Sequence, residues 1–198
     1  MKESKVFLIV IPGGMDIPYE EAEKWPALII LGTPNSGKTS LLYRLYSGIF
    51  YKNAPMAPSR PIEQVRVDNT LLRAINIIEN ELSYEEWSPM THGATAIIFL
   101  VDVSADQSIA EGMDLYKGVM ARLTVDGIYQ GIFGNKTDLR NYSSDALRQR
   151  FHENDHLNSA VNSPFFCVSL LTANNLRKSL ARFMYNANLT FHVPVFRK

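Results

Sequence analysis

Cysteine is nearly absent from this sequence of 198 residues, which contains Cys167 and no other. An internal disulfide and a zinc site built from several cysteines are therefore excluded. Cys167 stands within the apolar run FFCVSLL, which predicts a thiol buried in a strand. The chain suits a reducing compartment, where structural disulfides are rare.

An excess of charge is also missing, because Lys plus Arg and Asp plus Glu each number 20. No global charge selects a polyanion, so nucleic acid is not an expected partner. The apolar run VFLIVI, Val6 to Ile11, is much shorter than the roughly 20 residues that span a bilayer. It also lacks the cleavage pattern of a secretory signal, so we expect an edge strand or a docked segment there. Residue 2 is lysine rather than glycine, which excludes N-myristoylation.

The sequence does have a regular alternation of strand and helix patterns. The predicted strands span 27–32, 63–68, 71–78, 95–103, 129–136 and 164–170, and the predicted helices span 39–50, 108–123, 143–155 and 173–189. The central strands are continuous apolar runs, which is typical of strands covered on both faces. Alternation with short connections favours parallel pairing. The pattern predicts an α/β fold with a mostly parallel six-stranded sheet, helices on both faces, and one antiparallel hairpin turning at Asn69-Thr70.

The length suits one folded domain. We expect this domain to span 27–190, with an N-terminal extension at 1–26 and a C-terminal tail at 191–198.

A phosphate-binding pattern follows the first predicted strand. Residues Gly32 to Thr39 read GTPNSGKT and match G-x-x-x-x-G-K-[ST] between an apolar strand and a helix. The glycines let backbone N–H groups turn toward phosphate oxygens, and the helix N-terminus adds partial positive charge. In this pattern Lys38 bridges the β- and γ-phosphates and the Thr39 hydroxyl ligates Mg²⁺. The predicted contacts are Gly32, Pro34, Asn35, Ser36, Gly37, Lys38, Thr39 and Ser40. The alternative is a Gly-rich turn that no longer binds phosphate.

A base-reading pattern ends the strand within GIFGNKTDL, where Asn135, Lys136 and Asp138 form N-K-x-D. The Asp138 carboxylate can accept hydrogen bonds from both the ring N–H and the exocyclic amine of guanine, a pair of donors that adenine lacks. The wrong base would leave this carboxylate unpaired. The stem of Lys136 can cover the purine face, and Asn135 can tie this loop to the phosphate loop. The alternative is an ordinary polar loop after a strand.

These two motifs, with the segment THGATAIIFLVDVSADQSIAEGMDLYKGVM between them, resemble the Ras superfamily of small G proteins. The resemblance covers 27–190 and is closest to the Arf/Arl branch, near the signal-recognition-particle receptor beta subunit. It implies a P-loop NTPase G domain that binds GTP or GDP with Mg²⁺ and acts through protein partners. It also implies a base-contacting turn at Ser169 and Leu170, in which the backbone N–H of Leu170 meets the guanine carbonyl.

The chain departs from the family at the segment that senses and cleaves the γ-phosphate. In the register of the flanking motifs, the family's D-x-x-G-Q falls on Asn76 to Asn80. Asn76 has no charge to orient a metal-bound water, so Mg²⁺ should be held weakly. Glu79 adds bulk and negative charge where a glycine normally approaches the triphosphate. Asn80 is one methylene shorter than the glutamine that orients the attacking water.

The first switch segment is altered as well. The family's metal-sensing threonine falls near Met56 or Ala57, and Ser59 is the nearest hydroxyl. Prolines at 55, 58 and 61 stiffen this loop. We therefore expect a nucleotide-binding, cytoplasmic protein with weak or absent hydrolysis, which contacts partners through 53–61 and 76–90. Any membrane association would be peripheral and indirect. An active GTPase completed by a partner in trans and a pseudo-GTPase scaffold are the alternative hypotheses.

Overall fold

The computed structural model describes residues 26–50, 62–67, 70–75, 91, 93–121, 127–154 and 163–189, with the backbone alone described at 62–67, 71, 74, 75 and 154. Its elements in chain order are β1 (Ala27–Gly32), α2 (Lys38–Ser47), β2 (Ile62–Val67), β3 (Thr70–Ile75), β4 (Ala94–Asp102), α4 (Asp106–Met120), β5 (Tyr129–Asn135), α5 (Ser144–Asn154), β6 (Phe165–Cys167) and α6 (Leu176–Asn186).

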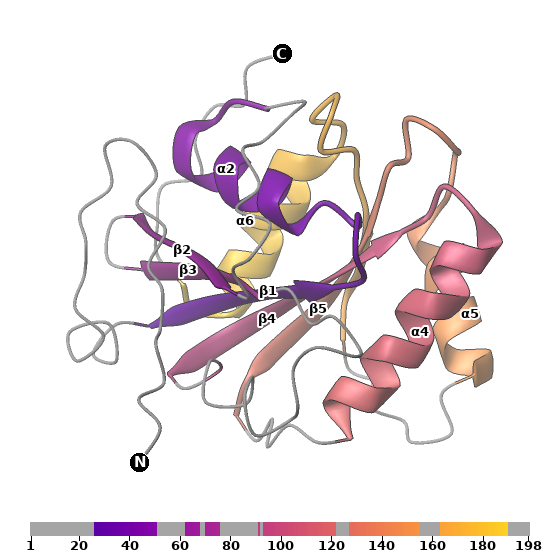
Figure 1. Ribbon diagram of the computed structural model, residues 1–198, viewed down its shortest axis with the longest axis horizontal. Coiled ribbons are helices and arrows are strands. Elements are labelled where there is room, and N and C mark those ends of the chain that lie inside the picture. The colour runs from indigo at the N-terminus through magenta and orange to yellow at the C-terminus, as the bar shows by residue number, and fades with distance from the viewer. Residues whose placement is uncertain are drawn as a thin grey trace.

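The strands form one six-stranded sheet in the order β2-β3-β1-β4-β5-β6 (Figure 1). β1 pairs in parallel with β3 and β4, and β5 pairs in parallel with β4 and β6. β2 and β3 are antiparallel, with Val67 opposite Thr70 at the turn. The predicted fold class and the predicted antiparallel hairpin are therefore confirmed, but Thr70 belongs to β3 rather than to the turn.

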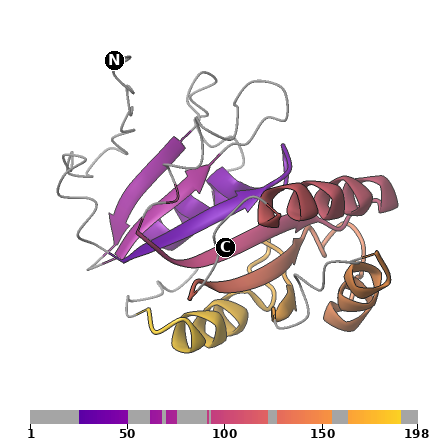
Figure 2. The ribbon, with the colours of Figure 1, turned by 90° about the horizontal axis from the view of Figure 1, so that it is seen from below.

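Helices cover both faces of this sheet, and Figure 2 shows β4 and β5 passing between α4 and α6. Successive side chains of β1 point to opposite faces. Leu28 and Ile30 belong to the cluster formed with α2 and α6, whereas Ile29 and Leu31 belong to the cluster formed with α4 and α5. The central strands are apolar throughout because helices cover both of their faces, as the sequence predicts.

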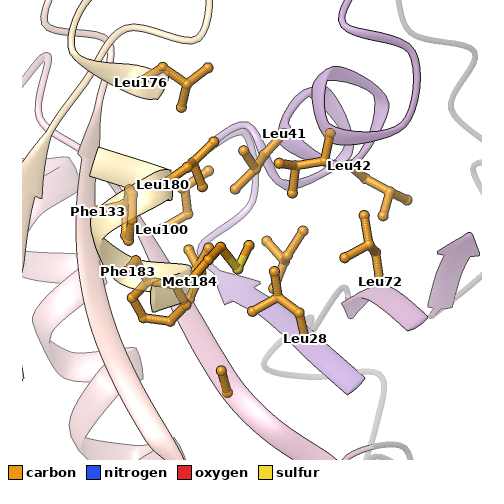
Figure 3. Close-up of a cluster of buried hydrophobic side chains, with 14 of the residues drawn as sticks. Leu28, Leu41, Leu42, Leu72, Leu100, Phe133, Leu176, Leu180, Phe183 and Met184 are labelled. Carbon is orange, nitrogen blue, oxygen red and sulfur yellow. The ribbon is translucent and has the colours of Figure 1, made fainter. Parts of the chain in front are cut away.

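The first of these clusters connects the two helices that flank the site described below. In Figure 3, Leu41 and Leu42 of α2 face Leu180 and Met184 of α6, with Leu28 of β1 beneath them. All five side chains are almost completely buried. Since packed apolar surface stabilises at about 25 cal/mol per Å², this contact fixes α2 relative to α6.

Most elements begin or end within a few residues of their predicted bounds, and three differ in a way that concerns the site. The helix predicted for 39–50 ends at Ser47, because Gly48 adopts a left-handed φ of 73° and its N–H bonds to the Arg44 carbonyl. This is a glycine C-cap, and the glycine was visible in the sequence. The last strand is limited to Phe165–Cys167, and the last helix begins at Leu176 rather than at 173.

Cys167 lies buried in β6, which confirms the prediction for this thiol. Burial raises its pKa to about 11. Within the described ranges, no helix is long and apolar enough to cross a membrane. The run from Val6 to Ile11, the extension 1–26 apart from Pro26, and the tail 191–198 lie outside the described residues. The domain bounds remain a prediction.

Candidate nucleotide-binding site

The predicted site residues follow three parallel strands of the one sheet. Residues 32–40 follow β1, Asn135 ends β5, and Ser169 lies two residues after β6. In a parallel sheet the carboxyl ends of the strands meet at one edge, which is where ligands bind in open α/β folds. The topology therefore brings the phosphate pattern, the base pattern and the last turn together.

The phosphate loop connects β1 directly to α2. Gly37 is the N-cap of α2, with φ of 105°, and no side chain caps this helix end by a hydrogen bond. Asn35 also takes a positive φ, of 60°. The first N–H groups of a helix have no intrahelical partner and carry partial positive charge. A helix N-terminus without a side-chain cap suits an anion such as a phosphate.

Both glycines of the loop are required by close packing. A Cβ on Gly32 would stand 2.2 Å from the Leu100 carbonyl oxygen, and one on Gly37 would stand 2.6 Å from Asn135 Nδ2. These separations are too short for any side chain. Position 37 therefore requires glycine in part because Asn135 of the base-reading motif packs against the phosphate loop.

Lys38 extends back over the loop from the first turn of α2. Its Nζ donates to the carbonyl oxygens of Gly32 at 2.9 Å and of Thr33 at 2.7 Å. The residue is 5% exposed. The ammonium is thus held inside the loop, where its charge complements a phosphate.

The single residue predicted to contact a metal is Thr39, which lies next to Lys38 in the first turn of α2. No group of three or more His, Cys, Asp or Glu among the described residues could hold a metal ion. Mg²⁺ typically keeps several waters and takes phosphate oxygens together with one or two protein ligands. One hydroxyl beside a phosphate loop fits that requirement.

Asn135 connects three segments of the site. Its Nδ2 donates to the Ser36 carbonyl at 2.9 Å, and its Oδ1 accepts from the Leu170 N–H at 3.0 Å. The residue is 4% exposed. The contact with the phosphate loop is the one predicted from the N-K-x-D motif. The contact with Leu170 adds the turn after β6 to the same unit.

Asp138 lies on the exposed side of this unit. The Ser169 hydroxyl donates to Asp138 Oδ1 at 2.5 Å, and the Thr172 N–H donates to the same hydroxyl at 3.1 Å. A carboxylate accepts several hydrogen bonds. The bond from Ser169 therefore orients Asp138 and leaves its carboxylate able to accept further hydrogen bonds. Ser169 thus acts on the carboxylate predicted to read guanine.

Lys136 forms an ion pair that the motif alone does not indicate. Its Nζ lies 2.5 Å from Asp102 Oδ2, and its backbone adopts a φ of 72°. Burial by itself would raise the pKa of Asp102. Hydrogen bonds from Lys136 and Ser104, together with the positive charge of Lys136, hold that pKa below its usual value. The ion pair fixes the direction of the lysine stem.

A family model described as the ADP-ribosylation factor family matches residues 18–187. The chain belongs to this family. Family members are small GTP-binding proteins of the Ras superfamily. Among similar proteins are ADP-ribosylation factor 1 of Brassica rapa subsp. pekinensis, 26% identical over 119 residues, and ADP-ribosylation factor J of Dictyostelium discoideum, 27% identical over 130 residues. The first alignment covers 60% of this chain and 65% of its relative, and the second covers 64% and 66%.

The chain therefore spans slightly less than two thirds of the length of these ADP-ribosylation factors. The family model extends further, across nearly all the described residues. This agrees with the fold, because the sheet order and the helices on both faces come from the same range.

In this member of the ADP-ribosylation factor family, Leu170 differs in one respect from its expected role. Its N–H, predicted to meet the guanine carbonyl, donates to Asn135 Oδ1. A backbone N–H can be shared between two acceptors, so the predicted contact requires such sharing or an exchange of partners. That contact remains a prediction.

Two site residues were not singled out by sequence reasoning. Asp102 was visible only as the acid that ends β4, and its partner Lys136 lies 34 positions away. Arg44 resembles an ordinary helix-surface arginine, yet it is completely buried. Its position among the leucines of LLYRL was the one available signal.

The altered catalytic segment, which includes Asn76, Glu79 and Asn80, lies outside the described residues. The same holds for 53–61, with Met56, Ala57 and Ser59. The predictions made for these residues stay predictions.

Proposed function

We propose that this chain is a guanine-nucleotide-binding protein, with GTP or GDP held between the phosphate loop and the N-K-x-D loop. The observation that carries the proposal is the pair of hydrogen bonds made by Asn135, to Ser36 at 2.9 Å and from Leu170 at 3.0 Å. These bonds join the phosphate and base motifs into one unit. Such preorganisation lowers the entropic cost of ligand binding.

Each residue type of the two motifs has a role in the proposal. Lys38 and the N-terminus of α2 neutralise phosphate charge. Thr39 would contribute one oxygen to Mg²⁺, which supplies further charge neutralisation when bound. Asp138, oriented by Ser169, accepts from the guanine edge. Lys136, held by Asp102, covers the base with its aliphatic stem.

We further propose that GTP hydrolysis is weak or absent in the isolated chain. This part rests on the sequence, where Asn76, Glu79 and Asn80 replace the acid, glycine and glutamine of the family pattern. With hydrolysis impaired, the protein acts through partners bound at 53–61 and 76–90. A cytoplasmic location with peripheral, indirect membrane association fits this role. The alternatives are a GTPase completed in trans and a scaffold without nucleotide exchange.

The binding proposal is tested by the nucleotide content of the purified protein and by titration with GDP and Mg²⁺. We expect bound guanine nucleotide, or micromolar or tighter binding of added GDP. Asp138→Asn should weaken GDP binding and reduce the preference for guanine over adenine. Asp114→Asn on the exposed face of α4 is the matched control, with GDP affinity unchanged. An empty protein that does not bind GDP would refute the proposal.

Hydrolysis is tested by single-turnover cleavage of GTP. We expect cleavage at the rate of the uncatalysed background, and faster cleavage after Asn76→Asp, Glu79→Gly and Asn80→Gln are combined. Stimulation of the wild-type chain by a cell extract would favour the GTPase completed in trans. Fast cleavage by the chain alone would contradict impaired hydrolysis.

A further inference from the structure

A fully buried arginine crosses the interface between α2 and the turn after β6. Arg44 is 0% exposed. Its Nε donates to the Leu170 carbonyl at 3.0 Å, and its Nη2 donates to the Leu171 carbonyl at 2.9 Å. The two bonds use adjacent nitrogens of a planar guanidinium and adjacent carbonyls of one turn. A lysine, with a single nitrogen, cannot reproduce this geometry.

The other side of the guanidinium is held by its own helix end. Nη1 donates to the Gly48 carbonyl at 3.3 Å, and the cation lies 5.4 Å from the centroid of the Phe50 ring. Burial lowers the pKa of Arg44, but an arginine stays charged in proteins. The side chain is therefore a fixed cation between the end of α2 and the turn 169–172.

These contacts act on the residue that Asn135 also holds. The N–H of Leu170 donates to Asn135, and the carbonyl of Leu170 accepts from Arg44. The preceding residue, Ser169, donates to Asp138. Arg44 thus restrains the turn from which the predicted guanine-reading carboxylate is oriented.

Stability alone is a poor explanation for this arginine. Burying a charge costs free energy, and a well-packed apolar side chain of similar volume often stabilises a fold as well or better. The guanidinium contributes geometric specificity, because its two fixed N–H donors are satisfied only when the two successive carbonyls adopt one orientation. The advantage therefore lies in placing the turn.

We infer that Arg44 is a positioning residue for guanine recognition, which acts through the turn at Leu170 and Leu171 on Ser169 and Asp138. The inference rests on the proposed guanine-nucleotide binding. The proposed role of Arg44 is exerted through the turn and requires no contact with the nucleotide. Its loss should reduce the accuracy with which Asp138 meets the base, and so reduce discrimination between bases.

The test compares GDP with IDP, which keeps the ring N–H but lacks the exocyclic amine. Dissociation constants are measured by calorimetry for the wild type, Arg44→Met and Arg44→Lys, with Arg182→Met on the exposed side of α6 as the control. Thermal unfolding without nucleotide is recorded for each. The wild type should prefer GDP by about tenfold or more, the value of one hydrogen bond to a charged acceptor.

Arg44→Met should bind GDP about tenfold more weakly, with a GDP-to-IDP preference that falls toward one. Arg44→Lys should lie between this variant and the wild type, and Arg182→Met should match the wild type. A merely structural role lowers the fraction of competent protein and weakens both nucleotides equally. An unchanged preference in Arg44→Met or Arg44→Lys would thus overturn the inference.

Two further outcomes separate this inference from the proposed function. If the wild type binds GDP and both Arg44 variants are unfolded before nucleotide is added, Arg44 is a structural residue and the inference fails while the function stands. If the folded wild type binds neither GDP nor IDP, the proposed function fails, and the positioning role fails with it.

Discussion

Replacement of Asn135 by alanine should destabilise the protein even without nucleotide. The substitution removes the acceptor of the Leu170 N–H and the donor to the Ser36 carbonyl. Both partners stay buried, because Leu170 is 2% exposed and Ser36 is 0% exposed. A buried polar group that loses its partner costs about 1–3 kcal/mol. Two such groups give an expected loss of about 2–6 kcal/mol in the free energy of unfolding.

For a chain of this length, 1 kcal/mol shifts the melting temperature by about 2–4 °C. The melting temperature of Asn135→Ala should therefore fall by about 4–24 °C, measured by circular dichroism in nucleotide-free buffer. Asn141→Ala is the control, because Asn141 is exposed in the loop before α5. Its melting temperature should equal that of the wild type.

Asn135→Asp separates the two bonds. An aspartate keeps an acceptor for Leu170 but replaces the donor to Ser36 by a second oxygen. At neutral pH we expect a loss at least as large as that of alanine, because a buried carboxylate would face a carbonyl. If Asn135→Ala melts within about 1 °C of the wild type, the hydrogen bonds do not join these segments as the structure indicates.

The remaining predictions concern packing, pH and reactivity. Gly37→Ala should cost about 1–3 kcal/mol in urea unfolding because of its φ of 105°. Gly118→Ala on α4, where a Cβ meets nothing within 4 Å, should raise the free energy of unfolding by about 0.5–1 kcal/mol. Equal changes in the two glycine variants would contradict this prediction. Because its folded pKa is lowered, Asp102 stabilises above its unfolded pKa of about 3.9 and loses this contribution as pH falls through the folded value. The stability difference between wild type and Asp102→Asn should thus close in acid, and a difference that widened there would refute the ion pair. Cys167, with a pKa raised to about 11, should react slowly with a disulfide reagent at neutral pH and rapidly in denaturant; rapid reaction of the native protein would contradict its burial.

The strands and helices were largely predictable because their signals are local. Continuous apolar runs indicated β1, β4 and β5 as central strands, and these lie at the centre of the sheet. Element ends were less predictable, as the helix stop at Gly48 shows. A glycine can either continue a helix at some cost or end it in the left-handed region. Only the packing around it decides between the two.

The sequence by itself determined which chemical groups the site contains. The glycines, Lys38 and Thr39 of the phosphate loop stand within eight consecutive positions, and Asn135 stands close to Asp138. Short motifs of this kind encode backbone geometry and donor type within a few residues, so they can be read without a fold.

Only the tertiary structure decided how these groups support one another. Arg44 bonds to Leu170 across 126 positions, Leu170 to Asn135 across 35 and Lys136 to Asp102 across 34. No local pattern specifies such pairs. They arise because the sheet order places the ends of β1, β4, β5 and β6 side by side, where buried polar groups must find partners.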